Sequence, residues 1–351
     1  MLITFSFEGK YGFADSNLQI VIEPQFPVIP LGKIPHFTEE GFAIVSFGPG
    51  AARVAIIDVT GNEILTLERG LINRVYRDLF HLSVFYLNDS RRMDSKIVRL
   101  SDNKIIASSL ASSVTYPSGD RYIMVRFLGE NRYTFIDSDG NRVLQHLLIE
   151  RDSNPFFEQR AVIYTDEWEE LLIIDMEGNT VGNLSFRFLG TGFSEGLLPA
   201  MTEDGTTGFV NRSGEFAFKI PLLNIYHELG ATSFSGGYAA KKTNVSPIVW
   251  RVINNHGQVV SGDIHAFEMR PFFDGLSLVR VFNRETQENR WGYVNARGEF
   301  LVRPVLEAAD DFRNGFARIK YNGREGLLNT NGKVIWSSNI VQNIIIEEDL
   351  W

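Results

Sequence analysis

The residue types that most often carry chemistry are few in this chain, and they are not grouped. There is no cysteine, which excludes thiolate catalysis, disulfides and cysteine-based metal sites. No two of the six histidines have a metal-ligand spacing, and none lies in a His-Glu-x-x-His pattern. We therefore predict structural or surface roles for these histidines, which are His36, His81, His146, His227, His256 and His265.

Carboxylates recur at Asp58, Asp137 and Asp175, and each is followed three residues later by a glycine. Calcium-binding repeats need several oxygen ligands that converge in each turn, whereas the equivalent positions later in this chain are asparagine. The sequence also lacks a Gly-x-Ser-x-Gly elbow, a P-loop and a dinucleotide-binding glycine motif. We predict no catalytic residue, no metal and no cofactor, and we do not expect an enzyme.

The Asx-x-x-Gly pattern is instead one half of a repeat. Clear copies end at Gly61, Gly140, Gly178, Gly214, Gly257, Gly298 and Gly332, and weaker copies end at Leu18 and Asn103. An Asx side chain can bind the following amides, and glycine adopts positive φ without strain. Between alternating apolar residues, each copy predicts a tight hairpin with a type I turn, with or without a bulge. Asparagine tolerates left-handed geometry at position 103, whereas leucine does not, so we expect another turn shape at Leu18.

A second pattern, aromatic-x-x-Gly-apolar-small-x-apolar, precedes most of these hairpins. It is clear at residues 37–45, 193–201, 234–241, 273–280 and 312–320, and degenerate at 80–85, 118–125 and 157–163. The small residue in four clear copies is Ala43, Ala239, Ser277 or Ala317. Small side chains at one point of a repeated strand indicate crowding near a common axis, with ordinary strand alanines as the alternative.

Together the two patterns predict an all-β fold of tandem hairpins, with about three strands in each unit. We place residues 1–351 in a single array of about nine units, near 9–26, 37–65, 80–106, 118–144, 156–181, 193–218, 234–260, 273–302 and 312–336. Such units cannot bury their own apolar faces and must pack on their neighbours. A propeller-like ring is favoured, with an open β-superhelix as the alternative. Strand-like runs at 2–7 and 339–346 could pair with each other and close the array.

These patterns resemble the bacterial WG-repeat family, also called KWG repeats. The similarity is greatest at residues 9–26, 193–216, 273–300 and 312–335. The naming dipeptide is intact at Trp291-Gly292, becomes Tyr11-Gly12, Thr207-Gly208, Trp250-Arg251 or Glu325-Gly326 elsewhere, and is lost between about 75 and 190. The resemblance implies an all-β repeat protein with no established catalytic residues, and it assigns no functional residue to this chain.

The composition of the chain limits the cellular locations and the classes of partner that we expect. The chain has 44% hydrophobic residues and 27 phenylalanines, enough for a large core. A net charge of −9 argues against nucleic acid as a partner and is compatible with a basic protein. There is no apolar run of about eighteen residues and no secretory signal, so we expect no membrane span and a cytoplasmic location, with a secreted form whose signal has been removed as the alternative. The oligomeric state is left open.

The loops between the first two strands of each unit must emerge on one edge of the array, and they vary most in sequence. Rigid repeats with unlike loops on one edge are typical of recognition scaffolds. One loop is rich in acids around an aromatic residue and is our candidate partner-binding loop: Asp166, Glu167, Trp168, Glu169 and Glu170. Charge and cation–π contacts there could bind a basic partner, although a solvated hairpin with Trp168 folded back is the alternative.

The function that we predict is a non-catalytic protein-binding scaffold. A carbohydrate or small-ligand binder, or a cryptic hydrolase with a site at the centre of the array, is the alternative, because propellers can assemble a site from several units. A purely structural repeat protein is the third possibility.

Overall fold

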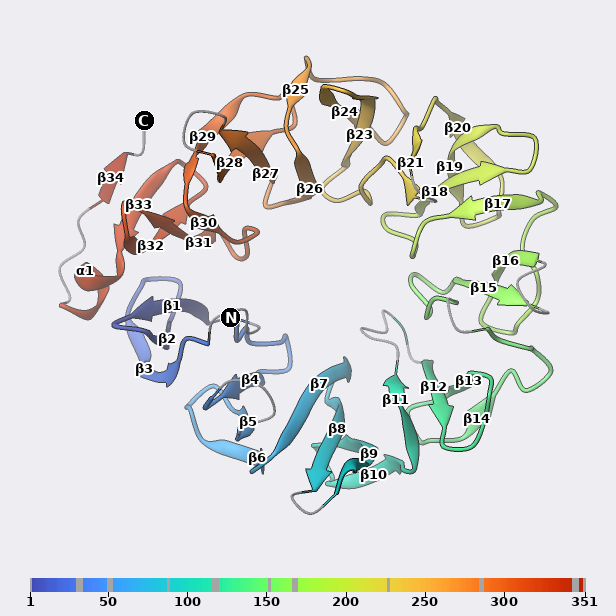
Figure 1. Cartoon of the computed structure of the whole chain (residues 1–351), viewed down its shortest axis with the longest axis horizontal. Helices are drawn as coiled ribbons and strands as arrows, with labels where there is room; N and C mark the ends of the chain where they lie inside the picture. The colour runs from blue at the N-terminus through green and yellow to red at the C-terminus, as the bar shows by residue number, and fades with distance from the viewer. Residues whose placement is uncertain are drawn as a thin grey trace. The chain divides into compact units, whose positions relative to one another are not determined.

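The computed structural model describes residues 2–29, 34–48, 53–86, 89–114, 120, 122–150, 153–165, 170–225, 228–283, 287–342 and 347–349. The chain divides into two compact bodies. The first body comprises Met1–Gln25, Leu197–Asn211 and Phe216–Trp351, and the second body comprises Phe26–Gly196 and Arg212–Glu215. Both consist almost entirely of β-strands, as the sequence predicts (Figure 1).

The strands of the second body are β4 (Ala43–Ser46), β5 (Val54–Ile57), β6 (Glu63–Leu67), β7 (Gly70–Tyr76), β8 (Leu79–Tyr86), β9 (Asp89–Arg99), β10 (Lys104–Ala107), β11 (Leu110–Val114), β12 (Ile123–Phe127), β13 (Thr134–Ile136), β14 (Arg142–Val143), β15 (Ala161–Thr165), β16 (Glu170–Ile174) and β17 (Phe186–Leu189). They form small sheets in which sequence neighbours pair, in the orders β4-β5-β6, β10-β9-β8-β7, β11-β12-β13-β14 and β15-β16. The paired strands are antiparallel, as tandem hairpins require.

The strands of the first body are β1 (Ile3–Phe7), β2 (Lys10–Ala14), β3 (Ile20–Pro27), β18 (Leu197–Thr202), β19 (Thr207–Asn211), β20 (Phe216–Lys219), β21 (Asn224–Ile225), β22 (Glu228–Leu229), β23 (Tyr238–Val245), β24 (Ile248–Asn254), β25 (Ile264–His265), β26 (Glu268–Phe273), β27 (Leu276–Asn283), β28 (Glu288–Asn295), β29 (Phe300–Leu306), β30 (Ala308–Ala309), β31 (Phe316–Tyr321), β32 (Arg324–Asn329), β33 (Lys333–Trp336) and β34 (Glu347–Asp349). One short helix, α1 (Ser337–Val341), is the only helix among the described residues. The sheets again follow sequence order, for example β26-β27-β28-β29 and β30-β31-β32-β33-β34.

Successive sheets share their apolar cores. In the second body, Leu79 and Ile97 pack with Ile123 of the next sheet. The neighbouring residues Phe80 and Leu82, on the other face of β8, pack with the sheet β4-β5-β6. Side chains alternate between the two faces of a strand, so one strand contributes to two cores. This is the packing that the repeat pattern predicts, since no sheet buries its own face.

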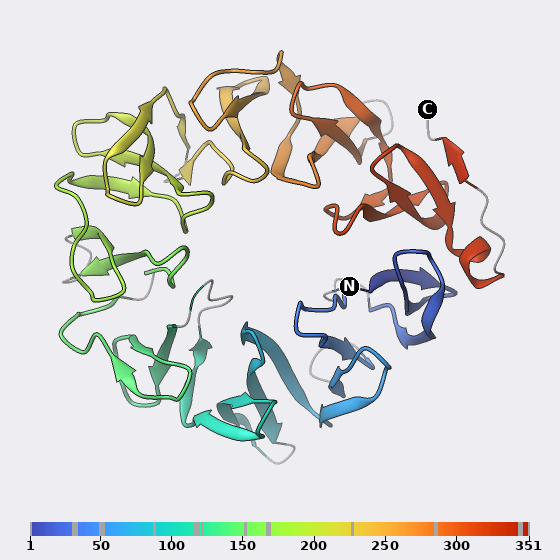
Figure 2. The same ribbon diagram turned by 180° about the vertical axis from the view of Figure 1, so that it is seen from behind.

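The same packing joins the two ends of the chain inside the first body. Ile3 and Phe5 share a core with Leu327, Ile335 and Ile340. The sheet β1-β2-β3 lies beside the sheet β30–β34 in both views (Figures 1 and 2). Among the described residues, β1 pairs with β2 and β34 pairs with β33, so the possible pairing between the two ends of the chain is not found there. The predicted strand at 339–346 begins instead within α1, and 343–346 lie outside the described residues.

The Asx-x-x-Gly turns have the predicted geometry. Asp58 Oδ1 accepts the N–H groups of Thr60 and Asn62 at 2.9 and 3.0 Å, and Gly61 has a φ of 88°. Our expectation for Leu18 was wrong, because Asp15 forms the same turn and Leu18 adopts a φ of 61°. The physical reason is burial: the Leu18 side chain is 8% exposed in the core shared with Phe5, which offsets roughly 1–2 kcal/mol of left-handed strain.

The glycine of the second pattern lies in a turn, although the sequence pattern places it in a strand. Positive φ at two consecutive residues, such as Asp274 and Gly275 or Asn314 and Gly315, marks a two-residue type I′ hairpin. A further strand therefore precedes the turn, β26 before β27 and β30 before β31. These sheets have more than the three strands that we predicted. The buried aromatic of the copy at 273–280 is Phe272, which is 1% exposed, and not Phe273.

The glycine of the Trp-Gly dipeptide makes room for the backbone of the next strand. A Cβ on Gly292 would lie 2.6 Å from the carbonyl oxygen of Val302 and 2.8 Å from the nitrogen of Pro304. The pairing of β28 with β29 shifts at this point, so that β29 bulges towards Gly292. The dipeptide is therefore explained by packing between strands.

Candidate binding pocket

The connections between strands differ at the two ends of each sheet, where the strands begin and finish. In β15-β16, Ala161 pairs with Ile174 at one end and Thr165 pairs with Glu170 at the other. We call the end with the two-residue turns and the Asx-x-x-Gly turns the turn edge, and the opposite end the loop edge. A strand of this length separates them by about 13–17 Å.

On the turn edge, a carboxylate of one sheet binds the turn of the next. In the second body, Asp120 Oδ2 accepts the Gln159 N–H at 2.6 Å, and the Glu158 carboxylate accepts the N–H groups of Glu195 and Gly196, both at 2.7 Å. In the first body, Asp274 accepts the Gly315 N–H at 2.8 Å in the same way. The sequence patterns did not predict these contacts, although an acid beside the turn glycine, as in Asp274-Gly275, was a visible signal.

The Glu158 carboxylate is held in its charged form. Burial disfavours the charge, but the Arg212 guanidinium at 2.8 Å and the two backbone amides outweigh it, so the pKa of Glu158 lies below its ordinary value. The turns that meet at this carboxylate are thus fixed by charge-assisted hydrogen bonds.

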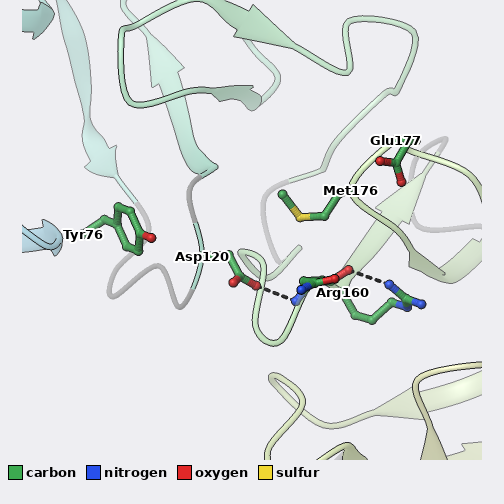
Figure 3. A pocket seen from close by; sticks show the side chains of 6 residues that line it. Tyr76, Asp120, Arg160, Met176 and Glu177 are labelled. Carbon is green, nitrogen blue, oxygen red and sulfur yellow. Dashed lines mark hydrogen bonds between the residues drawn. The ribbon is translucent and has the colours of Figure 1, made fainter.

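A pocket of about 400 Å³ opens on the turn edge of the second body (Figure 3). It is lined by residues from three successive sheets, namely Tyr76, Asp120, Gln159, Arg160, Met176 and Glu177. Tyr76 ends β7 and Asp120 precedes β12, while Gln159 and Arg160 precede β15. Met176 and Glu177 belong to the Asx-x-x-Gly turn after β16. The pocket therefore exists only because neighbouring sheets pack in sequence order.

Hydrogen bonds fix one wall of the pocket. The N–H of Gln159 donates to the Asp120 carboxylate, and the Gln159 carbonyl oxygen accepts the Nη1–H of Arg160 at 2.8 Å. The Nε–H of Arg160 donates to the carbonyl oxygen of Arg212, also at 2.8 Å. In Figure 3 the Tyr76 hydroxyl points toward Asp120, and the Arg160 side chain extends away from Asp120. The polar groups of this wall are thus oriented before any ligand binds.

The charges on the opposite side belong to the turn of Asp175. Burial opposes the ionisation of Asp175, but hydrogen bonds from Asn179 and Glu177 and the charge of Arg160 outweigh it, so its pKa is lowered. The Glu177 side chain is exposed at the mouth of the pocket and makes no ion pair within the described part of the chain.

The predicted binding loop does not contribute to this pocket. Asp166, Glu167, Trp168 and Glu169 lie outside the described residues, and Glu170 begins β16 on the loop edge. The pocket lies on the other edge of the same sheet. Sequence reasoning missed it because its lining residues carry no shared motif and are spread over about a hundred positions.

One other arrangement brings together side chains that could carry chemistry. His81 Nε2 is hydrogen-bonded to Ser95 Oγ, which resembles a base and a nucleophile, but the two residues are only 1% and 3% exposed. Burial lowers the pKa of His81 to about 4, so the imidazole is neutral and packed inside the sheet.

No group of three or more His, Cys, Asp or Glu side chains suited to a metal ion is found where the structure is described. Within the same residues, no helix has the length and apolar character to cross a bilayer.

Comparison with known proteins agrees with this repeat geometry. A family model described as WG containing repeat matches residues 11–48 and 291–324. These two segments carry WG repeats. Both matched segments include a glycine that lies against the backbone of the following strand, Gly12 and Gly292. No match was found among curated proteins.

One alignment with a solved structure bears on the fold of the chain. The crystal structure of a eukaryotic initiation factor aligns with a TM-score of 0.57 and 9% identity, covering 99% of this chain and 95% of the other. BamB from Moraxella catarrhalis aligns with a TM-score of 0.40 and 13% identity over 80% of this chain and 93% of BamB. The dihydro-heme d1 dehydrogenase NirN aligns with a TM-score of 0.46 and 14% identity over 99% of this chain and 72% of NirN. At 9% identity the likeness to the initiation factor concerns the fold alone, and the fold of this chain is all-β and built from tandem small sheets.

Proposed function

We propose that this WG-repeat chain is a non-catalytic scaffold that binds a partner protein, and that the pocket on the turn edge of the second body is a point of contact. The observation that carries the proposal is the construction of the pocket. Its walls come from three successive sheets and are fixed by the Asp120–Gln159 hydrogen bond and the Arg160 contacts.

Such a pocket favours recognition of a protruding side chain. Its volume of about 400 Å³ lies in the lower part of the range for small-ligand sites. Groups that are already oriented lose little conformational entropy on binding, which raises affinity without further contacts. The acidic loop from Asp166 to Glu170 remains a second predicted contact, on the loop edge, for a basic partner.

Site-directed photocrosslinking in the cells that make the protein tests this proposal. We would place a benzoylphenylalanine at Tyr76 in the pocket, at Trp168 in the predicted loop and at Glu203 as a control. Glu203 is exposed in the turn between β18 and β19, on a loop edge of the first body. We expect a specific crosslinked protein at Tyr76 that excess untagged wild-type chain competes away, and none at Glu203.

The same experiment can refute the proposal. Crosslinks of equal yield at Tyr76 and Glu203, or no crosslinked protein at Tyr76, would contradict a role of the pocket in protein binding. A crosslink confined to Trp168 would move the interface to the loop edge and would also contradict the pocket.

A further inference from the structure

We infer that the pocket on the turn edge selects the cationic head of a lysine or arginine side chain of the partner. This inference rests on the proposed function and adds the chemistry of the recognised group. It is drawn from the two carboxylates that line the pocket, Asp120 and Glu177, and from Arg160, the cation among its described lining residues.

The two carboxylates stand on different walls of the pocket. Asp120 belongs to the sheet β11–β14 and is aligned by the Gln159 N–H at 2.6 Å. Glu177 comes from the turn after β16, and its carboxylate faces the pocket from the other side (Figure 3). Both charges attract a cation that enters the pocket, and a carboxylate accepts several hydrogen bonds from an ammonium or guanidinium group.

Arg160 does not turn the pocket into an anion site. Its Nε–H and Nη1–H groups each donate to a backbone carbonyl oxygen, those of Arg212 and Gln159, at 2.8 Å. Its charge also acts on Asp175, which lies in the adjoining turn. The guanidinium is thus engaged within the wall, whereas the Glu177 carboxylate makes no ion pair in the described part of the chain.

The remaining lining residues suit the stem of a long cationic side chain. The thioether of Met176 is apolar and adaptable, and methylene groups pack well against it. The Tyr76 ring already holds the Arg77 guanidinium at 5.2 Å, and the Tyr76 hydroxyl is directed toward Asp120. The pocket therefore offers an apolar surface next to two acids. A lysine or arginine side chain has the matching arrangement, an apolar stem followed by a cationic head.

Binding of small probes to the full chain tests the selectivity. The probes are the Nα-acetyl methylamides of arginine, lysine, norleucine and glutamate, with binding followed by isothermal titration and by NMR shifts. We expect the arginine and lysine probes to bind about tenfold more tightly than norleucine, and glutamate to bind least. This preference should weaken as salt is raised, because the carboxylates are partly exposed.

Matched variants test whether the preference for cationic probes comes from the two carboxylates of the pocket. Asp120→Asn keeps an oxygen that can accept the Gln159 N–H but removes the charge, and Glu177→Gln removes the other charge without loss of volume. Each substitution should lower the affinity for the cationic probes about fivefold to tenfold and leave the affinity for norleucine unchanged. Glu203→Gln, which removes an exposed charge far along the chain, should have no effect on any probe.

The outcomes separate this inference from the proposed function. Equal binding of all four probes, or cationic binding that survives both Asp120→Asn and Glu177→Gln, overturns the inference even if Tyr76 captures a protein. Cationic binding without any protein captured at Tyr76 overturns the protein partner instead. Tighter binding of spermidine than of the arginine or the lysine probe would overturn the inference, because the ligand of the pocket would then be a free polyamine.

Discussion

The second strand of the repeat carries a glycine in some units and a side chain in others, and Gly292 of the first body and Ala55 of the second body show this contrast. In the first body, Gly12 and Gly292 each lie against the backbone of the following strand, where a Cβ would collide, and opposite Gly292 that strand bulges. In the second body, the position equivalent to Gly292 in β5 is Ala55, which pairs directly with Thr66 of β6. A side chain is accommodated there, and the register of β5 with β6 shifts only after it, between Ile56 and Ile57.

This difference shows what the Trp-Gly dipeptide does. At Gly292 the glycine accommodates a bulge in the neighbouring strand, whereas Gly208 and Gly326 pair directly with that strand and still leave no room for a Cβ, which would lie 2.3 and 2.9 Å from a carbonyl oxygen. The motif can therefore fade from the sequence while the sheet remains. The pocket lies in the second body, among sheets that lack the Trp-Gly dipeptide. The dipeptide therefore indicates a packing contact between strands and not the candidate site.

The largest effect that we predict comes from filling the space at Gly292. Gly292→Ala should destabilise the first body by about 3 kcal/mol, because its Cβ would meet the Val302 carbonyl at 2.6 Å and the bulge would have to move. Urea unfolding followed by tryptophan fluorescence measures this, since Trp250, Trp291 and Trp336 all lie in the first body.

A second glycine provides the control for this prediction. Gly323 has a φ of 75°, and a Cβ added there would have no neighbour within 4 Å, so Gly323→Ala should cost only about 1–2 kcal/mol of backbone strain. Equal costs for the two variants would refute the role that we give to the bulge.

The second prediction concerns acid stability in the second body. Burial lowers the pKa of His81 from 6.5 to about 4. Above pH 6.5 the group is neutral in both the folded and the unfolded chain and contributes no pH dependence. Between pH 6.5 and about 4 only the unfolded chain binds the proton, so the folded state loses about 3 kcal/mol as the pH falls.

Denaturant unfolding at pH 7.5 and at pH 4.5, followed by circular dichroism, measures this loss. His81→Gln cannot bind the proton and should lose less stability between the two pH values than the wild type, by about 2–3 kcal/mol. The exposed His256 serves as the control, and His256→Gln should follow the wild type. A wild type and a His81→Gln variant with the same pH dependence would contradict a buried neutral imidazole.

The sequence predicts those parts of the fold that depend on local chemistry. Asp58 and Gly61 form the expected turn because an Asx side chain and a flexible glycine are sufficient for it. The apolar alternation around them predicts the hairpins, and the repeat spacing predicts the packing of sheet on sheet. These inferences need only residues that are close in the sequence.

The parts that could not be predicted depend on contacts between sheets. Asp120 and Gln159 are 39 residues apart, and nothing in either segment indicates that the carboxylate accepts the other's N–H. The pocket is further determined by Tyr76 and Glu177, which approach each other only after three sheets have packed. A site assembled in this way has no signature in one sequence.

The smallest effects that we predict compare one turn position in the two bodies. Leu18 and Asn103 both occupy the left-handed last position of a repeat turn, with φ of 61° and 54°, although the turn of Asn103 begins at Leu100 and not at an Asx residue. Glycine relieves the strain at either site, so the turn pattern alone would predict that Leu18→Gly and Asn103→Gly both stabilise the chain.

We expect the two substitutions to have opposite signs. Leu18 is 8% exposed and packs with Ile3 and Phe5, so its removal loses about 1.5–3 kcal/mol of burial against a smaller relief of strain, and Leu18→Gly should be destabilising by about 1 kcal/mol. Asn103 is exposed, so Asn103→Gly should gain up to about 0.5 kcal/mol. Urea midpoints of the two variants test this directly. Stabilisation by Leu18→Gly would show that the core shared by the two ends of the chain contributes less than the geometry of a single turn.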